Sequence, residues 1–129
     1  MTSLLTRFRW LAAIGVSAIA FQAHASGPYP DKPVRIVVPF PPGGTLDTLG
    51  RALAQKLSEQ MGQQFVVENK AGASGSIGVA AAANSPPDGY TLLVSVPDAI
   101  SIYPLVKKNP PYRVDKDLTP VTLIAKMPI

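Results

Sequence analysis

The spacing of apolar residues changes along the chain, and each change marks a short structural element. Residues 34–38 read VRIVV, a β-branched and almost wholly apolar run that favours a strand buried on both faces of a parallel sheet. From residue 46 onward, apolar residues recur every three or four positions, which predicts an amphipathic helix ended by Gly62. These positions are Leu46, Leu49, Leu53, Ala54, Leu57 and Met61.

The same order of strand, glycine-rich turn and helix then repeats. Residues 64–68 predict a second strand, NKAGASGSIG makes the turn, and residues 79–84 (VAAAAN) predict a second helix. After the SPPDGY turn, residues 90–96 predict a third strand. Residues 98–107 predict a short irregular helix, residues 109–120 a loop, and residues 121–125 a fourth strand. This alternation predicts an α/β fold, with helices on both faces of a parallel sheet.

Residues 1–25 have the layout of a cleavable secretory signal peptide. Arg7 and Arg9 precede the 12-residue uncharged run WLAAIGVSAIAF, and Ala23 and Ala25 are small enough for a signal peptidase site. The alternative is a membrane anchor, but 12 residues rise only about 18 Å as a helix, against a hydrocarbon core of about 30 Å. We therefore expect cleavage after Ala25 and a periplasmic product of residues 26–129.

Cysteine and histidine usage limits the chemistry of that product. The chain has no cysteine, which excludes a lipoprotein anchor and disulfides, and its single histidine, His24, lies in the predicted signal peptide. Ser-His and Cys-His nucleophiles and the usual zinc sites all need one of these residues, so we expect no metal, no cofactor and no enzyme. An enzyme would have to work through Asp47, Asp98 or a serine.

The charge of the chain does not indicate a nucleic-acid partner. Loss of Arg7 and Arg9 with the signal peptide reduces the net charge from +4 to +2, with ten basic residues against eight acidic ones. The remaining Lys and Arg residues form no run interleaved with aromatic residues, which is the usual footprint of a nucleic-acid-binding segment.

The PFPPGG loop, residues 39–44, joins the first predicted strand to the first helix. Ligands of open α/β sheets bind at this edge, where the strands end. The prolines restrict the backbone, while Gly43 and Gly44 permit positive φ and close approach of a ligand. Amides at a helix start bind anions such as carboxylates. We expect Thr45 to be the N-cap, and Asp47 either to contact a ligand or only to stabilise the helix start.

Two further polar segments, GASGSIG and the residues around Ser95 and Asp98, lie near the ends of predicted strands. Neither GASGSIG nor PPGGTLDT of the first loop has the residue spacing of a nucleotide-binding motif. GASGSIG is equally well explained as a second anion-binding loop or as a tight turn whose small residues let helix and sheet pack. Ser95 and Asp98 flank the end of the third predicted strand and are expected to face the same crevice, although Asp98 is equally a solvated helix cap.

Several separated motifs, in the right order, resemble the amino-terminal part of one family. These motifs are YPDKPVRIVVPFPPGG, VENKAGASGSIG, PDGYTLL and DKDLTPVTLIA. They resemble the Bug family of periplasmic solute receptors, the extracytoplasmic binding proteins of tripartite tricarboxylate transporters. The resemblance implies the first lobe of a two-lobed, type II-like periplasmic binding protein. Such a receptor closes on a small carboxylate, either a di- or tricarboxylate, an amino acid or an aromatic acid, and presents it to membrane permease subunits.

The resemblance also implies which residues bind the ligand. In the family, the loop after the first strand contributes backbone contacts to the ligand carboxylate, partly through ordered water. The corresponding positions in this sequence are Phe40, Pro42, Gly43, Gly44, Thr45 and Asp47, with Ser74, Gly75, Ser76 and Ser95 as weaker candidates. SVPDAISIYP departs from the small, Gly/Ser/Thr-rich stretch common at this place in the family, so this loop does not identify the ligand.

Length is the larger departure from the family, whose members are well over twice as long. We expect the second lobe and the segment that completes the first lobe to be absent from the 129-residue chain. Ligand binding by this chain alone is then expected to be weak or absent, and apolar surface to be left uncovered. The alternative functions are a ligand-independent periplasmic interaction or sensor fragment and a non-functional gene remnant.

Overall fold

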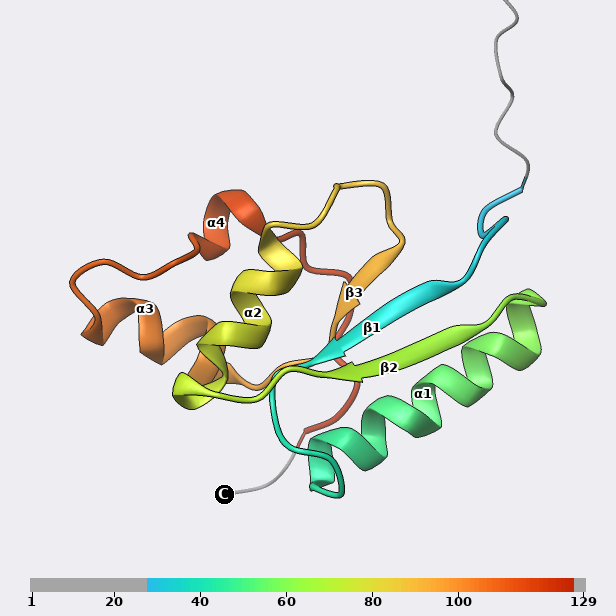
Figure 1. The fold of residues 1–129 in the computed structure, drawn as a ribbon, viewed down its shortest axis with the longest axis horizontal. Helices are drawn as coiled ribbons and strands as arrows, with labels where there is room; N and C mark the ends of the chain where they lie inside the picture. Colours follow the sequence, from blue (N-terminus) through green and yellow to red (C-terminus); the bar gives the residue numbers. More distant parts are fainter. Residues whose placement is uncertain (1–27, 127–129) are drawn as a thin grey trace, which may run out of the picture.

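Three parallel strands form the sheet at the centre of the structure, a computed structural model that describes residues 28–126 (Figure 1). The central strand β1 (Val34–Val38) lies between β2 (Phe65–Asn69) and β3 (Thr91–Leu93). Val38 pairs with Asn69 and Val37 with Leu93, so all three strands end at the same edge of the sheet. The predicted signal peptide and its cleavage site lie outside the described residues.

Helices cover both faces of this sheet, as the sequence predicts. On one face lies α1 (Thr45–Met61), which runs beneath β2 and β1 and ends at Gly62 in a left-handed conformation with φ 69° (Figure 1). The other helices gather on the opposite face. They are η1 (Ala73–Gly75), α2 (Ser76–Ala83), η2 (Asp98–Ile102), α3 (Tyr103–Val106) and α4 (Val114–Asp117).

The core of the α1 face follows the two-residue period of β1. Val34, Ile36 and Val38 pack there with Ala54 and Phe65, while Val37 points to the opposite face, and these four apolar side chains of β1 have 0% exposure. Burying each such side chain stabilises the fold by about 1.5–3 kcal/mol. The prediction of a strand buried on both faces is therefore confirmed.

The opposite face has its own core, built from Val79, Ala99 and Tyr112. The hydroxyl of Tyr112 donates a hydrogen bond to the Ala99 carbonyl, which ties the chain after α3 to η2. The predicted loop at residues 109–120 is wrong in one respect, because it contains the single helical turn α4. The Asp117 side chain accepts a hydrogen bond from the Arg113 amide at 2.7 Å and thereby satisfies a donor at the start of that turn.

Element boundaries differ from the predictions in the second half of the chain. The second helix begins at Ser76 rather than at residue 79, and β3 is shorter than the predicted 90–96. The predicted fourth strand at residues 121–125 is wrong, because this segment has no strand conformation and leaves Val121 82% and Leu123 66% exposed. An apolar β-branched run forms a strand only where it pairs with a neighbour, and no described strand pairs with this segment.

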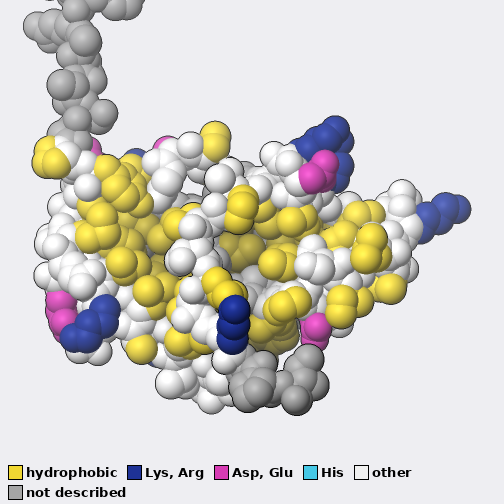
Figure 2. All heavy atoms as spheres, turned by 180° about the vertical axis from the view of Figure 1, so that it is seen from behind, with side chains coloured by type: hydrophobic (Ala, Val, Ile, Leu, Met, Phe, Trp, Pro, Cys, Tyr) yellow, Lys and Arg dark blue, Asp and Glu magenta, His cyan; other side chains and the backbone are white. Residues whose placement is uncertain are grey.

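Apolar side chains remain exposed over much of one side of the molecule. Figure 2 shows hydrophobic side chains spread across the back face, around a hollow near its middle. The exposed large apolar residues include Leu105 and Val106 of α3 and Val121, Leu123 and Ile124 near the described end of the chain. Surfaces of this kind are usually covered by more protein.

None of the helices between residues 28 and 126 is both long enough and apolar enough to cross a bilayer.

Two glycines allow the helices to approach β1 closely. A Cβ on Gly50 of α1 would lie 2.9 Å from Cγ2 of Val38, and a Cβ on Gly78 of α2 would lie 2.7 Å from Cα of Pro39 and from the Lys70 carbonyl oxygen. Real Cβ atoms do not come so close to backbone atoms. At Gly78, the last glycine of GASGSIG, the structure therefore supports the packing role.

We expect Gly78→Ala to lower the free energy of unfolding by about 1–3 kcal/mol, because the backbone atoms it meets cannot move aside. The better helix propensity of alanine offsets at most about 1 kcal/mol of this loss. Urea denaturation followed by circular dichroism measures the change. Gly44→Ala is the matched control, since its Cβ would meet only the Pro41 carbonyl oxygen at 3.7 Å. Equal stability of the two variants would contradict the packing role of Gly78.

Candidate functional site

The loops that follow the three strands meet at the edge where the strands end. The first comprises residues 39–44, and we call it, together with the first turn of α1, the α1 mouth (residues 39–47). Pro39 is buried beneath the loop, whereas residues 41–45 are exposed. Gly43 has φ 84°, a left-handed conformation that favours glycine. The α1 mouth is therefore a fixed turn in which residues 41–45 face solvent.

The Phe40 ring connects this loop to the second one. A Cβ on Gly75 would lie 3.4 Å from Cζ of Phe40 and 3.0 Å from the Cβ of Ala99, so the ring, the η1 loop and η2 are in close contact. Gly75 has φ 87°, and the non-glycine residues Ala73 and Ser74 have φ 46° and 55°. Left-handed non-glycine residues are strained and cluster at functional sites.

The start of α1 differs from the prediction that Thr45 is its N-cap. The N-cap is Gly44, with φ −78° and ψ 170°, and its carbonyl accepts the Thr48 amide at 3.0 Å and the Thr48 hydroxyl at 3.1 Å. Thr45 is the first helical residue. Its side chain is not needed as a cap, because Asp47 reaches back and accepts the Gly43 amide at 2.8 Å. The N-cap prediction was therefore wrong by one residue.

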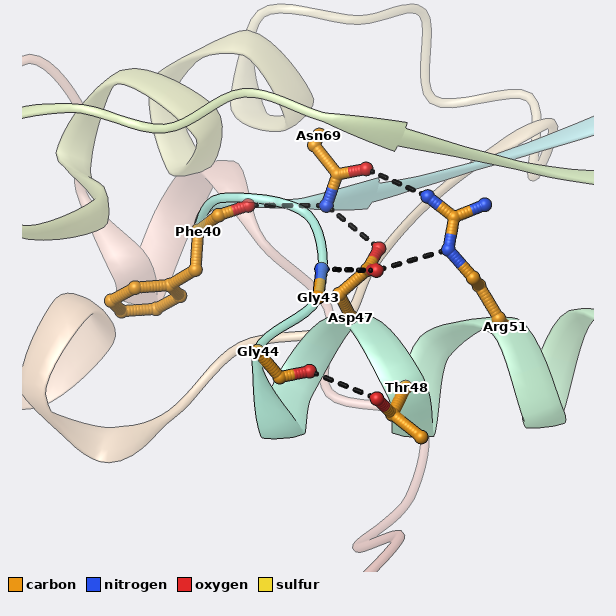
Figure 3. Close-up of polar contacts among 7 residues, drawn as sticks. All are labelled: Phe40, Gly43, Gly44, Asp47, Thr48, Arg51 and Asn69. Carbon is orange, nitrogen blue, oxygen red and sulfur yellow. Dashed lines mark hydrogen bonds and ion pairs between the residues drawn. The ribbon is translucent and has the colours of Figure 1, made fainter.

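The Asp47 carboxylate is buried, with 4% exposure, and is surrounded by donors (Figure 3). Oδ2 accepts the Gly43 amide at 2.8 Å and Nε of Arg51 at 3.0 Å, while Oδ1 accepts Nδ2 of Asn69 at 2.8 Å. Asn69 also donates to the Phe40 carbonyl at 3.1 Å and accepts Nη2 of Arg51 at 3.1 Å. We call these five residues the Asp47 network. It ties the α1 mouth to the end of β2.

Hydrogen bonding in this network lowers the pKa of Asp47 from 3.8 to about 2. The largest cause is the hydrogen bond from Arg51, followed by those from the Gly43 amide and the Asn69 side chain, and together these outweigh the opposing effect of desolvation. Asp47 is therefore a carboxylate at neutral pH, although it is almost fully buried.

Arg51 and Asn69 did not emerge from the sequence as site residues. Arg51 has a signal, because it lies four residues after Asp47 on the helix, a spacing at which opposite charges pair. Asn69 has a weaker one, as a polar residue that ends an apolar strand. Its approach to residue 40 depends on the parallel pairing of β1 with β2, which no local pattern specifies.

The structure brings most of the predicted site residues to one edge of the sheet. Ser74 is exposed at the η1 turn, Ser76 is buried at the start of α2, and Ser95 is half-buried just beyond β3. Asp98 is exposed at the start of η2. The residues at the α1 mouth are Phe40, Pro42, Gly43, Gly44, Thr45 and Asp47, and Gly75 contacts them through the Phe40 ring.

The α1 mouth can offer donors to an anion but little acid–base chemistry. The first amides of a helix, here those of the N-cap Gly44 and of Thr45 and Leu46, have no acceptor within the helix and are placed at the positive end of its dipole. Asp47 is fully engaged by neighbouring donors. Among residues 28–126, no cluster of acidic, His or Cys side chains could hold a metal ion. The arrangement therefore suits recognition of an anion by backbone amides.

Comparison with known proteins supports the same interpretation. The sequence profile described as "Tripartite tricarboxylate transporter family receptor" (TctC) matches residues 49–129. The chain belongs to this family. The resemblance drawn from the sequence motifs is confirmed, and TctC is a family of binding proteins rather than of enzymes.

Individual TctC relatives extend the match to the α1 mouth. BugT of Bordetella pertussis is 42% identical over 130 residues, covering 94% of this chain and 38% of BugT. MatC from Rhodopseudomonas palustris, solved with bound malate, is 35% identical with a TM-score of 0.70 over 74% of this chain and 33% of MatC. A second R. palustris protein, solved with adipate, is 42% identical with a TM-score of 0.62 over 65% of this chain and 28% of that protein.

The chain thus spans about a third of the length of these relatives. The predicted α/β fold, with its parallel sheet as part of a periplasmic binding protein, is confirmed by the structural matches.

We expect acid to weaken the fold through Asp47. Because its pKa falls from 3.8 to about 2 on folding, the unfolded chain binds the proton more tightly. The stability that Asp47 contributes is complete above about pH 4 and is lost as the pH falls toward 2. In urea denaturation at each pH, the free energy of unfolding should decrease more over this range in the parent chain than in Asp47→Asn.

Asp115→Asn, at an exposed position in α4, is the matched control and should follow the parent. A parent chain and an Asp47→Asn variant with the same dependence on pH would show that the Asp47 network does not stabilise the folded state.

Proposed function

We propose that this chain is the part of a periplasmic solute receptor that binds a carboxylate group of a small metabolite, for uptake by a tripartite transporter. The observation that supports this most strongly is the geometry of the α1 mouth. A turn with fixed backbone dihedrals presents helix-start amides to solvent, and its own acidic residue is turned inward and bonded. Such amides complement a carboxylate.

The rigidity of the loop favours binding. Pro39, Pro41 and Pro42 restrict φ, Gly43 is held by Asp47, and the Phe40 carbonyl is held by Asn69. Groups that are already ordered lose little entropy when a ligand binds, so more of the hydrogen-bond energy appears as affinity. Gly43 contributes through its conformation, since its amide is already bonded to Asp47. We assign the direct contacts to the amides that follow, in Gly44 and Thr45.

The ligands of two relatives support a carboxylate as the recognised group. MatC was solved with malate and the second R. palustris protein with adipate, and both are dicarboxylates. We propose that Ser74, Gly75, Ser76 and Ser95 line the same crevice and contact the rest of the ligand. The predicted signal peptide and the family support the periplasm as the place of binding, and we propose the membrane subunits of the transporter as partners.

Full binding in this proposal requires more protein than this chain supplies. A receptor that closes around its ligand uses surfaces on both sides of the ligand, and the chain spans only about a third of its relatives. We therefore expect the isolated chain to bind dicarboxylates weakly. A chimera in which it replaces the matching segment of BugT is expected to bind more tightly.

Thr45→Pro tests the role of the helix-start amides. Proline is well tolerated at the first helical position, and the extended Gly44 before it is compatible with proline, so the variant should lose one N–H while keeping α1. We expect malate affinity to fall about tenfold, as for one lost hydrogen bond to a charged group. Thr45→Ala, which keeps the amide and loses the hydroxyl, is the matched control and should bind malate like the parent.

Binding is measured by NMR titration of amide shifts in the chain and by calorimetry in the chimera. A chimera that binds no dicarboxylate would refute the proposed function. Equal malate affinity in Thr45→Pro and Thr45→Ala would show that the Thr45 amide does not contact the ligand.

A further inference from the structure

We propose that Asn69 and Arg51 are positioning residues, which keep the acceptor groups of the α1 mouth turned into the protein so that only amide donors face a bound carboxylate. This inference rests on the proposed function, because it explains how a loop that contains an acidic residue can bind an acidic ligand. Both residues lie outside the loop itself, one at the end of β2 and the other in α1 (Figure 3).

The Asn69 side chain has only one orientation that satisfies its neighbours. Its Nδ2 donates to Oδ1 of Asp47 at 2.8 Å and to the Phe40 carbonyl at 3.1 Å, while its Oδ1 accepts Nη2 of Arg51 at 3.1 Å. Reversing the amide would place an acceptor against two acceptors and a donor against a guanidinium. Asn69 therefore binds the two acceptors of the α1 mouth that would otherwise oppose an anionic ligand.

Pairing between the strands fixes the place of Asn69. It lies opposite Val38 in the parallel ladder, and the next residue, Lys70, donates its amide to the Val38 carbonyl at 2.9 Å. The pairing with Val38 and the hydrogen bond of the next residue hold the Asn69 backbone in place. The Asn69 side chain therefore reaches residue 40 from a fixed position in the sheet. The position of the loop is therefore set by the sheet as well as by the prolines of the loop.

Arg51 compensates the negative charge of the Asp47 carboxylate, which the neutral Asn69 side chain cannot do. The Asp47 carboxylate lies 2.8 Å from the Gly43 amide, one residue before the amides assigned to the ligand. An uncompensated charge there would repel a ligand carboxylate, and this repulsion increases as the two charges approach each other. Nε of Arg51 lies 3.0 Å from Oδ2 of Asp47, and the Arg51 side chain is 55% exposed, so it can be replaced without opening the core.

The first test measures positioning without any ligand. Hydrogen exchange of the Gly43 amide, followed by NMR in the 129-residue chain, should be at least about tenfold faster in Asn69→Leu, because the bond between Gly43 and Asp47 loses its support. Asn84→Leu is the matched control, since its side chain donates only to the Ala80 carbonyl on exposed surface of α2. Unchanged Gly43 exchange in a folded Asn69→Leu variant would overturn the positioning role.

The second test separates charge compensation from a purely structural role. In Arg51→Gln, malate affinity should fall about tenfold at low salt, and the loss should shrink at high salt, where charge repulsion is screened. Adding Asp47→Asn to Arg51→Gln should recover most of the lost affinity, because the charge to be compensated is gone. Arg113→Gln, an exposed arginine in the turn before α4, is the matched control.

The outcomes distinguish the two proposals. A parent chain that binds no malate, alone or in the BugT chimera, contradicts the proposed function, and Gly43 exchange then decides the positioning role by itself. If malate binds, a loss in Arg51→Gln that is independent of salt and persists with Asp47→Asn would overturn charge compensation.

Discussion

The burial of β1 on both faces is the constraint on which the other elements depend. A strand whose four apolar side chains all lie at 0% exposure needs a partner on each face and on each edge, and the chain supplies α1, α2, β2 and β3 in those four places. Glycines at the two helix contacts, Gly50 and Gly78, let backbone approach the strand closely. Because all three strands run parallel, the chain leaves each of them at the same edge, and this brings the candidate site loops together.

A buried carboxylate then fixes the first of these loops. Removing a charge from water is costly unless donors replace the water, and Asp47 receives one donor each from the loop, the helix and β2. The low pKa of about 2 reflects how completely these donors compensate for burial. An acidic residue at a helix start ordinarily interacts with the helix dipole. Here it also fastens the loop to the sheet, and this leaves the helix-start amides free.

The sequence predicted well those features that depend on local pattern, and less well those that depend on distant pairing. The apolar run at residues 34–38, the helical spacing ending at Gly62 and the alternation of strands with helices were all correct. The fourth strand failed because β propensity does not supply a pairing neighbour. Thr45 was misplaced as a cap because the actual partner of Gly43 is a residue within the helix, which reaches back to it. Asn69 was missed because its partner, residue 40, becomes its neighbour only through the β1–β2 register.

The two loops at the candidate site are held in different ways, and this difference bears on what each can recognise. The first is fixed by prolines and by side chains from other elements, so its backbone geometry is independent of any ligand. The second depends on left-handed residues, Ala73, Ser74 and Gly75, and on contact with the Phe40 ring. Strained backbone of this kind clusters at ligand clamps and at segments that change conformation. We therefore infer that, in the proposed function, the α1 mouth recognises a carboxylate group, while adaptation to the rest of the ligand falls to the η1 loop.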